Sequence, residues 1–256
     1  MVTTNLDVVE RECLSFTVRG PWAHFRRIDT TVEKLTYRVI PRTTVAGLLA
    51  AVLGEPRDSY YDTFEADNSA IAISVAPECE LETQAIPQLT LPTTQGDLNQ
   101  VTGTSRSSIV DPKQIAASSQ RRTFEYIVDA GYQIDIVLDD EETFNRLREF
   151  LDSGKATYTP CLGKTECLAD LTDVNASTIV DEGDPEAIDS TVPEQHIAPE
   201  PGRPLRMERT PAYMRADSGG RQTTGFTSYG YAPNGETIVA PSAPAVSVDG
   251  RSVCFR

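Results

Sequence analysis

The sequence predicts an α+β fold, and three patterns near its start carry that prediction. Residues 13–19 alternate between apolar and polar side chains, which is typical of a half-buried strand. Residues 45–53 repeat apolar side chains at the spacing of one helix face, and Gly54 follows them as a stop signal. Residues 71–75 alternate again. The chain is therefore expected to begin with a strand, a helix and a second strand.

The same reasoning extends the series of strands. Residues 79–86 are expected to pair with the strand at 71–75. Two more strands are predicted at 124–128 and 132–138, on either side of a turn at 129–131, because Asp-Ala-Gly is a turn-forming sequence.

A second helix is predicted after Asp139, because Asp139 with Glu142 three residues later has the spacing of a capping box. Its apolar face would comprise Phe144, Leu147 and Leu151. A last strand is expected at 167–174. The resulting order, β-α-β-β-(arm)-β-α-β, is that of a ferredoxin-like or RRM-type domain.

Residues 87–120 interrupt this order. They are rich in Thr, Gln, Ser and Gly and lack hydrophobic periodicity, so we interpret them as an inserted, thumb-like arm. The arm divides the predicted domain into a first part, residues 1–86, and a second part, residues 121–174.

The remaining chain divides into two segments. Residues 175–200 are acidic and poor in apolar side chains, which predicts a mobile linker. Residues 201–256 contain the hairpin-turn signals Asn234-Gly235 and Asp249-Gly250, which predict a small C-terminal β appendage.

Composition limits the functional classes. No apolar run approaches the roughly 18 residues of a membrane span, and the N-terminus lacks a secretory signal, so a soluble, cytoplasmic protein without membrane contact is expected. The five cysteines fit no common zinc spacing, and neither a metal nor a cofactor is expected. Walker, GxGxxG, nucleophile-elbow and HExxH motifs are missing from the sequence.

The net charge of −15 at first argues against nucleic acid as a ligand. However, ten of the acidic residues lie between Thr165 and Gly202, where no Lys or Arg occurs. Basic residues gather instead at 19–42 and at 201–221. An acidic chain with only four lysines is typical of a salt-saturated cytoplasm, in which a Debye length of roughly 3 Å screens repulsion from RNA.

Residues 16–27 combine a strand end with Trp, His, Phe and Arg side chains. Aromatic rings stack on RNA bases and guanidinium groups bind phosphates, so this segment is a candidate RNA-binding site. The full set of candidate RNA-binding residues is Arg19, Trp22, His24, Phe25, Arg26, Arg27, Tyr37, Arg42, Arg121, Arg122, Gly163 and Lys164.

Other interpretations of these residues stay open. Trp22 and Phe25 equally suit packing beneath the first helix. The Arg121-Arg122 pair is either solvated or in contact with phosphate. His24 suits a stacking role, a packed loop position or, less readily, general acid–base catalysis.

Two segments resemble a known family. Arg19-Gly-Pro-Trp-Ala-His-Phe-Arg26, Thr36-Tyr37 and Pro41-Arg-Thr-Thr-Val-Ala-Gly-Leu-Leu49 are similar to the N-terminal signature of the CRISPR-associated "Cas five" proteins of the RAMP superfamily. Tyr158–Cys167 resembles a second motif of that family, with Cys161 in place of an aromatic residue. The resemblance covers residues 13–60 and 121–173. With the acidic composition, it points to a haloarchaeal member of the type I-B group.

The resemblance implies an RRM-like RAMP domain whose thumb is the arm at 87–120. It also implies a non-catalytic subunit of the antiviral surveillance complex Cascade. Such a subunit would cap the 5′ handle of the crRNA and contact the backbone and large subunits, with any contribution to target DNA made indirectly.

A catalytic alternative comes from one branch of this family, which cleaves precursor crRNA with Tyr, Lys and His. Those residues are not carried over to this sequence, because Arg121-Arg122 stands where a Lys-His dipeptide would lie at the arm base. The runner-up function is a metal-independent endoribonuclease that uses His24 and Tyr37. A third possibility is an acidic scaffold without RNA contact.

Overall fold

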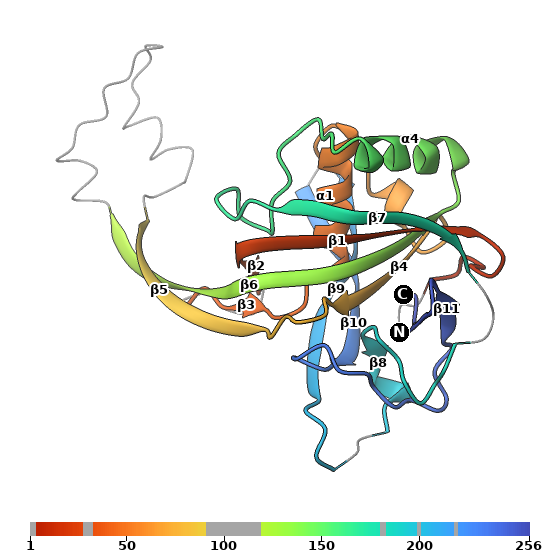
Figure 1. The fold of residues 1–256 in the computed structure, drawn as a ribbon. Helices are drawn as coiled ribbons and strands as arrows, with labels where there is room; N and C mark the ends of the chain where they lie inside the picture. Colours follow the sequence, from red (N-terminus) through yellow and green to blue (C-terminus); the bar gives the residue numbers. More distant parts are fainter. Residues whose placement is uncertain (1–3, 28–32, 91–118, 180–182, 199–200, 218–219) are drawn as a thin grey trace.

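A five-stranded antiparallel sheet forms the centre of the computed structural model, which describes residues 4–27, 33–90, 119–179, 183–198, 201–217 and 220–256 (Figure 1). Four strands lie in the order β4-β6-β1-β7, and β5 pairs with the far end of β6. Their bounds are β1 Glu12–Ala23, β4 Ser69–Val75, β5 Glu82–Thr90, β6 Gln120–Leu138 and β7 Asp170–Thr178. With the two helices, the chain order is β1-α1-β4-β5-β6-α4-β7, so the fold is α+β and mostly β.

Both predicted helices are present. Helix α1 (Arg42–Leu53) ends at Gly54, whose φ of 79° is the left-handed conformation that glycine adopts without strain. Helix α4 (Glu141–Asp152) begins one residue later than predicted: its N-cap is Asp140, whose side chain accepts a hydrogen bond from the Thr143 amide at 3.0 Å. No helix in the described part of the chain is long and apolar enough to cross a membrane.

Each face of the sheet is covered. The side of β1 that carries Leu14, Phe16 and Val18 packs in one core with α1 and α4. On the other side, Cys13 packs with the hairpin of β11 (Val246–Val248) and β12 (Arg251–Val253). Successive side chains of β1 point to opposite faces of the sheet, so this one strand contributes side chains to both cores.

Two predictions about the strands are wrong. The segments at 124–128 and 132–138 belong to one long strand, β6, in which Asp129 has a φ of 47° but does not reverse the chain. Pairing with β1 continues through Ala130 and Gly131, so the sheet overrides the local turn signal. Strand β5 pairs with β6 and not with the strand at 71–75.

Strands β5 and β6 extend together beyond the rest of the sheet (Figure 1). Their ladder ends at the pair Thr90–Gln120, so the described ends of the predicted arm form a two-stranded stem. The rest of the arm, 91–118, lies outside the described residues.

The described part of the predicted acidic linker is packed, not mobile. Residues up to Thr178 belong to β7, and Ile188 and Val192 are both fully buried. Apolar side chains spaced among the acidic ones give this segment its own contacts, beside β8 (Val192–Pro193) and the 3₁₀ turn η2 (Glu194–His196). The sequence prediction of a mobile linker rested on the many acidic residues and overlooked these apolar ones.

The C-terminal part is integrated with the central domain rather than appended to it. Strands β9 (Arg206–Asp217) and β10 (Gly220–Tyr231) form a long hairpin, and Tyr229 joins the main core. Arg256 and Ile71 of β4 exchange two backbone hydrogen bonds. Of the two turn signals, Asp249-Gly250 connects β11 to β12 as predicted, whereas Asn234-Gly235 follows β10 without a hairpin.

Candidate nucleic-acid interface

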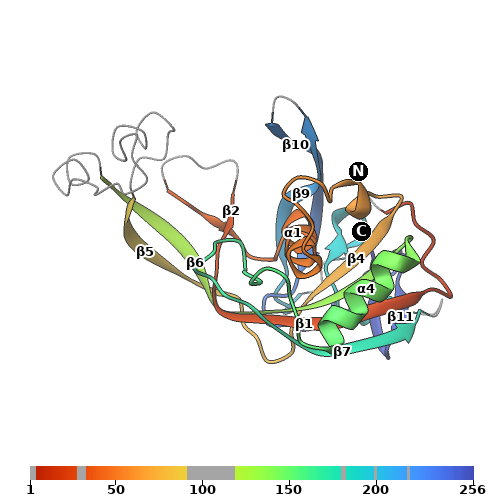
Figure 2. The ribbon, with the colours of Figure 1, turned by 90° about the horizontal axis from the view of Figure 1, so that it is seen from above.

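A groove of about 610 Å³ lies where the end of β1 meets helix α1. Its walls are β2 (Phe25–Arg26), one side of α1, the loop at 161–164 and the tip of the β9–β10 hairpin. Figure 2 shows β2 between β6 on one side and α1 with β9 on the other. Short β3 (Thr36–Tyr37), which pairs with β2, and the 3₁₀ turn η1 (Asp62–Phe64) complete this region.

Four aromatic rings gather beside this groove. The His24 ring lies 5.5 Å from the ring of Phe124 and 5.4 Å from that of Tyr126, measured between centroids. Trp22 meets Tyr126 edge to face at 5.9 Å. Phe124 and Trp22 are only half-buried, so part of each ring faces solvent. We name His24, Phe124, Tyr126 and Trp22 the aromatic cluster.

Lys164 adds a positive charge to the aromatic cluster. Its ammonium nitrogen lies 4.2 Å from the centroid of Phe124, and it donates a hydrogen bond of 2.7 Å to the Tyr126 hydroxyl. It also lies 2.5 Å from a carboxylate oxygen of Glu166. Desolvation opposes the charged form, but Glu166 and Tyr126 outweigh it and raise the pKa of Lys164. The lysine is therefore a fixed cation at neutral pH.

Gly163 brings the loop at 161–164 against β1. Its φ is 92°, and a Cβ atom there would lie 2.1 Å from the carbonyl oxygen of His24. The His24 amide donates a hydrogen bond to the Leu162 carbonyl at 3.0 Å, which holds the two segments together. Only glycine permits this approach, so Gly163 determines where Lys164 is placed.

The imidazole of His24 is held in one orientation. Its Nδ1 lies 2.7 Å from the carbonyl oxygen of Glu125, an acceptor, so Nδ1 carries the proton. Burial lowers the pKa of His24, and the charge of Lys164 acts in the same direction. The ring is therefore neutral at pH 7, and Nε2 is the unprotonated nitrogen.

Three cations lie near one another at the base of the β5–β6 stem. Desolvation lowers the pKa of Lys34, and the charges of Arg26 and Arg122 lower it further. Arg26 is exposed and lines the groove. Arg121, beside Arg122, is also exposed. Backbone hydrogen bonds between Lys34 and β6 fix this arrangement.

The structure corrects the prediction for Arg42. Its side chain is 1% exposed, and its guanidinium donates hydrogen bonds to the carbonyls of Phe64 and Arg256 and to the Ser69 hydroxyl. It also stacks on Tyr213, 4.2 Å from the ring centroid. Burial lowers the pKa of Arg42 to about 10. Arg42 thus joins α1 to the C-terminal strands and is closed to RNA.

Phe25 and Tyr37 are likewise core residues. Both side chains are buried, and Phe25 packs 5.9 Å from the ring of Tyr132. Core packing, the alternative stated for Phe25, is therefore the observed one, and neither ring has a free face for a base.

Arg19 and Arg27 lie outside the groove lining. Arg19 directs its guanidinium to the Cys79 sulfur and the Pro77 carbonyl, each at 3.2 Å. Arg27 lies over the Tyr37 ring at 5.7 Å. The structure thus brings Trp22, His24, Arg26, Arg122, Gly163 and Lys164 into one region and leaves these two arginines apart.

Sequence reasoning missed Phe124 and Tyr126. The sequence did contain a signal for this pair: Phe124 and Tyr126 are two residues apart on a strand, so their side chains share one face. Arg122, a predicted site residue, lies two residues before Phe124. Sequence reasoning also missed Tyr61 and Arg221, which both contact Asp58, at 2.7 Å and 2.5 Å. The sequence separation between Asp58 and Arg221 left no local signal. In the described residues, no group of three or more His, Cys, Asp or Glu side chains is placed to hold a metal.

Comparison with known proteins agrees with this architecture. A structure of similar fold is titled "CRISPR RNA-guided surveillance complex"; it has a TM-score of 0.52 and 15% identity, covering 90% of this chain and 92% of the other. A second is a CRISPR protein from Archaeoglobus fulgidus, with a TM-score of 0.53 and 12% identity, covering 96% and 100% of the two chains. No curated protein matches.

These likenesses show that the chain shares its α+β fold with those two proteins. The model of the family described as "CRISPR-associated protein (Cas_Cas5)" matches residues 13–228. The chain belongs to this family of CRISPR-associated proteins.

Proposed function

We propose that the protein is the non-catalytic guide-RNA-binding subunit of a type I surveillance complex, and that it caps the 5′ handle of the crRNA. The observation that carries this proposal is the aromatic cluster with Lys164, next to the cations Arg26, Lys34 and Arg122. Half-exposed rings take unstacked bases, and adjacent cations take the phosphates between them.

The fold supports the same role. The order β4-β6-β1-β7, with its two connecting helices, fits a ferredoxin-like domain of the RAMP type. The β5–β6 stem lies at the base of the thumb expected from the sequence, and such a thumb would separate the handle from the spacer. The acidic composition fits a haloarchaeal type I-B complex, in which the subunit would contact the backbone and large subunits.

The local chemistry favours binding over catalysis. His24 is 3% exposed, and its Nδ1 is occupied by the Glu125 carbonyl. The Lys164 ammonium is already paired with Glu166. The Nε2 lone pair of His24 is not protonated, but so little of the ring is exposed that RNA has little access to it, and this disfavours general acid–base catalysis by His24.

RNA binding without cleavage is the direct test. The purified chain would be mixed with labelled repeat-spacer precursor RNA in high-potassium buffer containing EDTA. Binding of the handle with intact RNA is expected. Replacing Phe124 with Ala removes a stacking ring, worth about 1–3 kcal/mol, so affinity should fall about five- to 150-fold.

A matched control separates binding from general charge. Arg26→Ala is expected to weaken binding, whereas Arg148→Ala, which removes a half-buried arginine on α4, should leave it unchanged. Equal affinities for both variants would mean that Arg26 does not contact the RNA, whereas no binding by the wild-type chain would favour the scaffold without RNA contact.

A second candidate, a metal-independent endoribonuclease, is favoured by one observation. The structure brings a Tyr, a Lys and a His together as Tyr126, Lys164 and His24, although their sequence positions gave no sign of it. These differ from the pair considered from the sequence, in which Tyr37 stood in the place of Tyr126. Cleavage near the repeat–spacer junction in EDTA, abolished by His24→Ala with binding retained, would establish this function and exclude the first.

A further inference from the structure

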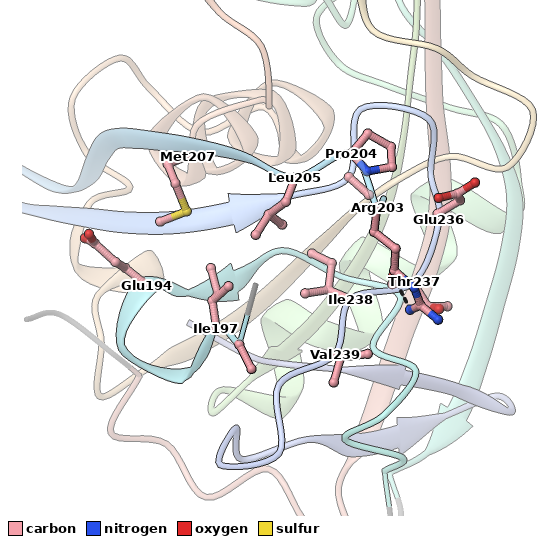
Figure 3. Close-up of a pocket in the computed structure, with 12 residues that line it drawn as sticks. Glu194, Ile197, Arg203, Pro204, Leu205, Met207, Glu236, Thr237, Ile238 and Val239 are labelled. Atoms are coloured by element: carbon pink, nitrogen blue, oxygen red, sulfur yellow. Dashed lines mark hydrogen bonds between the residues drawn. The ribbon is translucent and has the colours of Figure 1, made fainter. Parts of the chain in front are cut away.

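A second pocket, of about 500 Å³, lies at the other end of the β9–β10 hairpin. Figure 3 shows the side chains of Ile197, Leu205, Met207 and Ile238 directed toward one another across it. Met207 is 49% exposed, which is unusual for a large apolar side chain in the described part of this chain. The pocket shares no lining residue with the groove of the aromatic cluster.

The floor of this pocket depends on a glycine in β10. A Cβ atom at Gly230 would lie 2.3 Å from the Cδ1 atom of Ile197 and 3.3 Å from the sulfur of Met207. Because Gly230 has no side chain, Ile197 and Met207 settle onto the strand and leave the space above them open. The pocket is therefore built into the hairpin.

The rim of the pocket is acidic at one end. Glu194 lies at that end, away from Arg203 and Glu236 at the opposite end (Figure 3). Within the described residues, no hydrogen bond or ion pair reaches the Glu194 carboxylate, whereas Arg203 contacts the Thr237 carbonyl at 3.5 Å. An occupant with an apolar part and a positive charge would satisfy both the walls and Glu194.

We propose that this pocket binds a short apolar segment of a neighbouring protein subunit, with a Lys or Arg of that subunit placed over Glu194. The inference rests on the proposed role as a subunit of a surveillance complex. A pocket with apolar walls that is open to solvent has the form that receives an apolar anchor side chain of a partner protein. An apolar centre with a charged rim is the usual anatomy of such a surface.

Crosslinking from the pocket would identify the occupant. The full chain would carry benzoylphenylalanine in place of Met207 and be purified with the other protein subunits and the guide RNA. Irradiation is expected to attach a different protein subunit, at an apolar residue adjacent to Lys or Arg. The same amino acid in place of Tyr158, which is 57% exposed elsewhere, serves as the control position.

Other crosslinking results would overturn the proposal. These are an adduct to RNA, an adduct to a second copy of this chain, or none in a complex that has assembled with its RNA. A small apolar molecule released from the purified chain in stoichiometric amount would also overturn it.

Substitutions test the energetics separately. Glu194→Lys and Met207→Glu are expected to lower the retained amount of that one subunit at least tenfold while guide RNA stays bound. Gly230→Ala should act similarly by moving Ile197 into the pocket, with thermal denaturation used to confirm folding. Glu149→Lys, at an exposed position on α4, is the charge control and should change nothing.

The two proposals fail in different ways. Loss of guide RNA from the wild-type complex would remove the proposed function. Retention of every subunit and of the RNA in the Glu194→Lys and Met207→Glu complexes would remove only this inference.

Discussion

Asp135 in β6 and Arg251 in β12 form a bidentate ion pair, which joins the central sheet to the β11–β12 hairpin. Asp135 is fully buried, one arginine nitrogen lies 2.9 Å from it, and the second also donates to the carboxylate. Ser15 of β1 donates a further hydrogen bond at 2.6 Å. The pair attaches the C-terminal hairpin to the centre of the sheet.

Removing Arg251 should therefore destabilise the whole protein. Arg251→Ala leaves a buried carboxylate without its partner, which costs about 3–5 kcal/mol in the free energy of unfolding. Denaturant unfolding monitored by circular dichroism measures this. Arg11→Ala, which breaks the exposed pair with Asp139, is the control and should cost at most about 1 kcal/mol. Equal losses would mean that the buried pair has no special role.

Gly163→Ala should abolish RNA binding while the protein stays folded. The new Cβ atom would collide with the His24 carbonyl, so the loop that carries Lys164 must move away from the aromatic cluster. Gly154→Ala is a matched control, because Gly154 also has a positive φ, 63°, but nothing lies within 4 Å of its Cβ position. RNA affinity and thermal denaturation of both variants are the measurements. Unchanged affinity in Gly163→Ala would show that loop placement does not matter.

Stability should fall as the pH decreases below the ordinary His range. Because burial lowers the pKa of His24 in the folded state, the unfolded chain binds the proton more readily. The contribution of His24 is complete above the unfolded pKa of about 6.5 and is lost as the pH falls toward the folded pKa. The free energy of unfolding would be measured at pH 7.5 and 5.5 for the wild type and for His24→Asn. The difference between the two proteins in this pH dependence is the contribution of His24. An identical pH dependence in both proteins would contradict it.

Arg42 and Arg26 should give opposite phenotypes. Arg42→Lys cannot replace the several directed hydrogen bonds of the buried guanidinium, and losing hydrogen bonds to a charged group costs about 1.5–3 kcal/mol each. The melting temperature of the Arg42→Lys variant should therefore be lower than that of the wild type. Arg26→Ala should melt like wild type but bind RNA more weakly, because Arg26 is exposed on the groove. A reduced affinity for Arg42→Lys without a change in melting would restore Arg42 as a binding residue.

Local patterns were enough for the elements whose apolar side chains follow one period along the sequence. The alternation in β1 and β4 and the apolar face of α4 predicted these elements within a few residues. They were not enough where the sheet decides the conformation. Asp129-Ala-Gly131 resembles a turn, but pairing on both sides keeps β6 extended.

The candidate site shows the same division. Trp22, His24 and Arg26 were chosen as candidates because they lie close together in the sequence, and Arg42 was included because it is near them. Its burial follows from contacts with Ser69 and Arg256, which no local pattern reveals. The meeting of Lys164 with Tyr126 depends on the Gly163 loop crossing to β1.

The outer edge of β4 has a further consequence. Backbone contacts from distant parts of the chain cover the edge of β4 that faces away from β6. Ser190 pairs with Ser74, Thr191 donates to the carbonyl of Ile73, and Arg256 pairs with Ile71. Before these distant residues are synthesised, that apolar strand has an open edge, which is a template for pairing with another chain. We therefore expect a nascent or truncated chain that lacks these residues to self-associate through the edge of β4, and we expect the segment that includes Ser190 to prevent this in the complete fold.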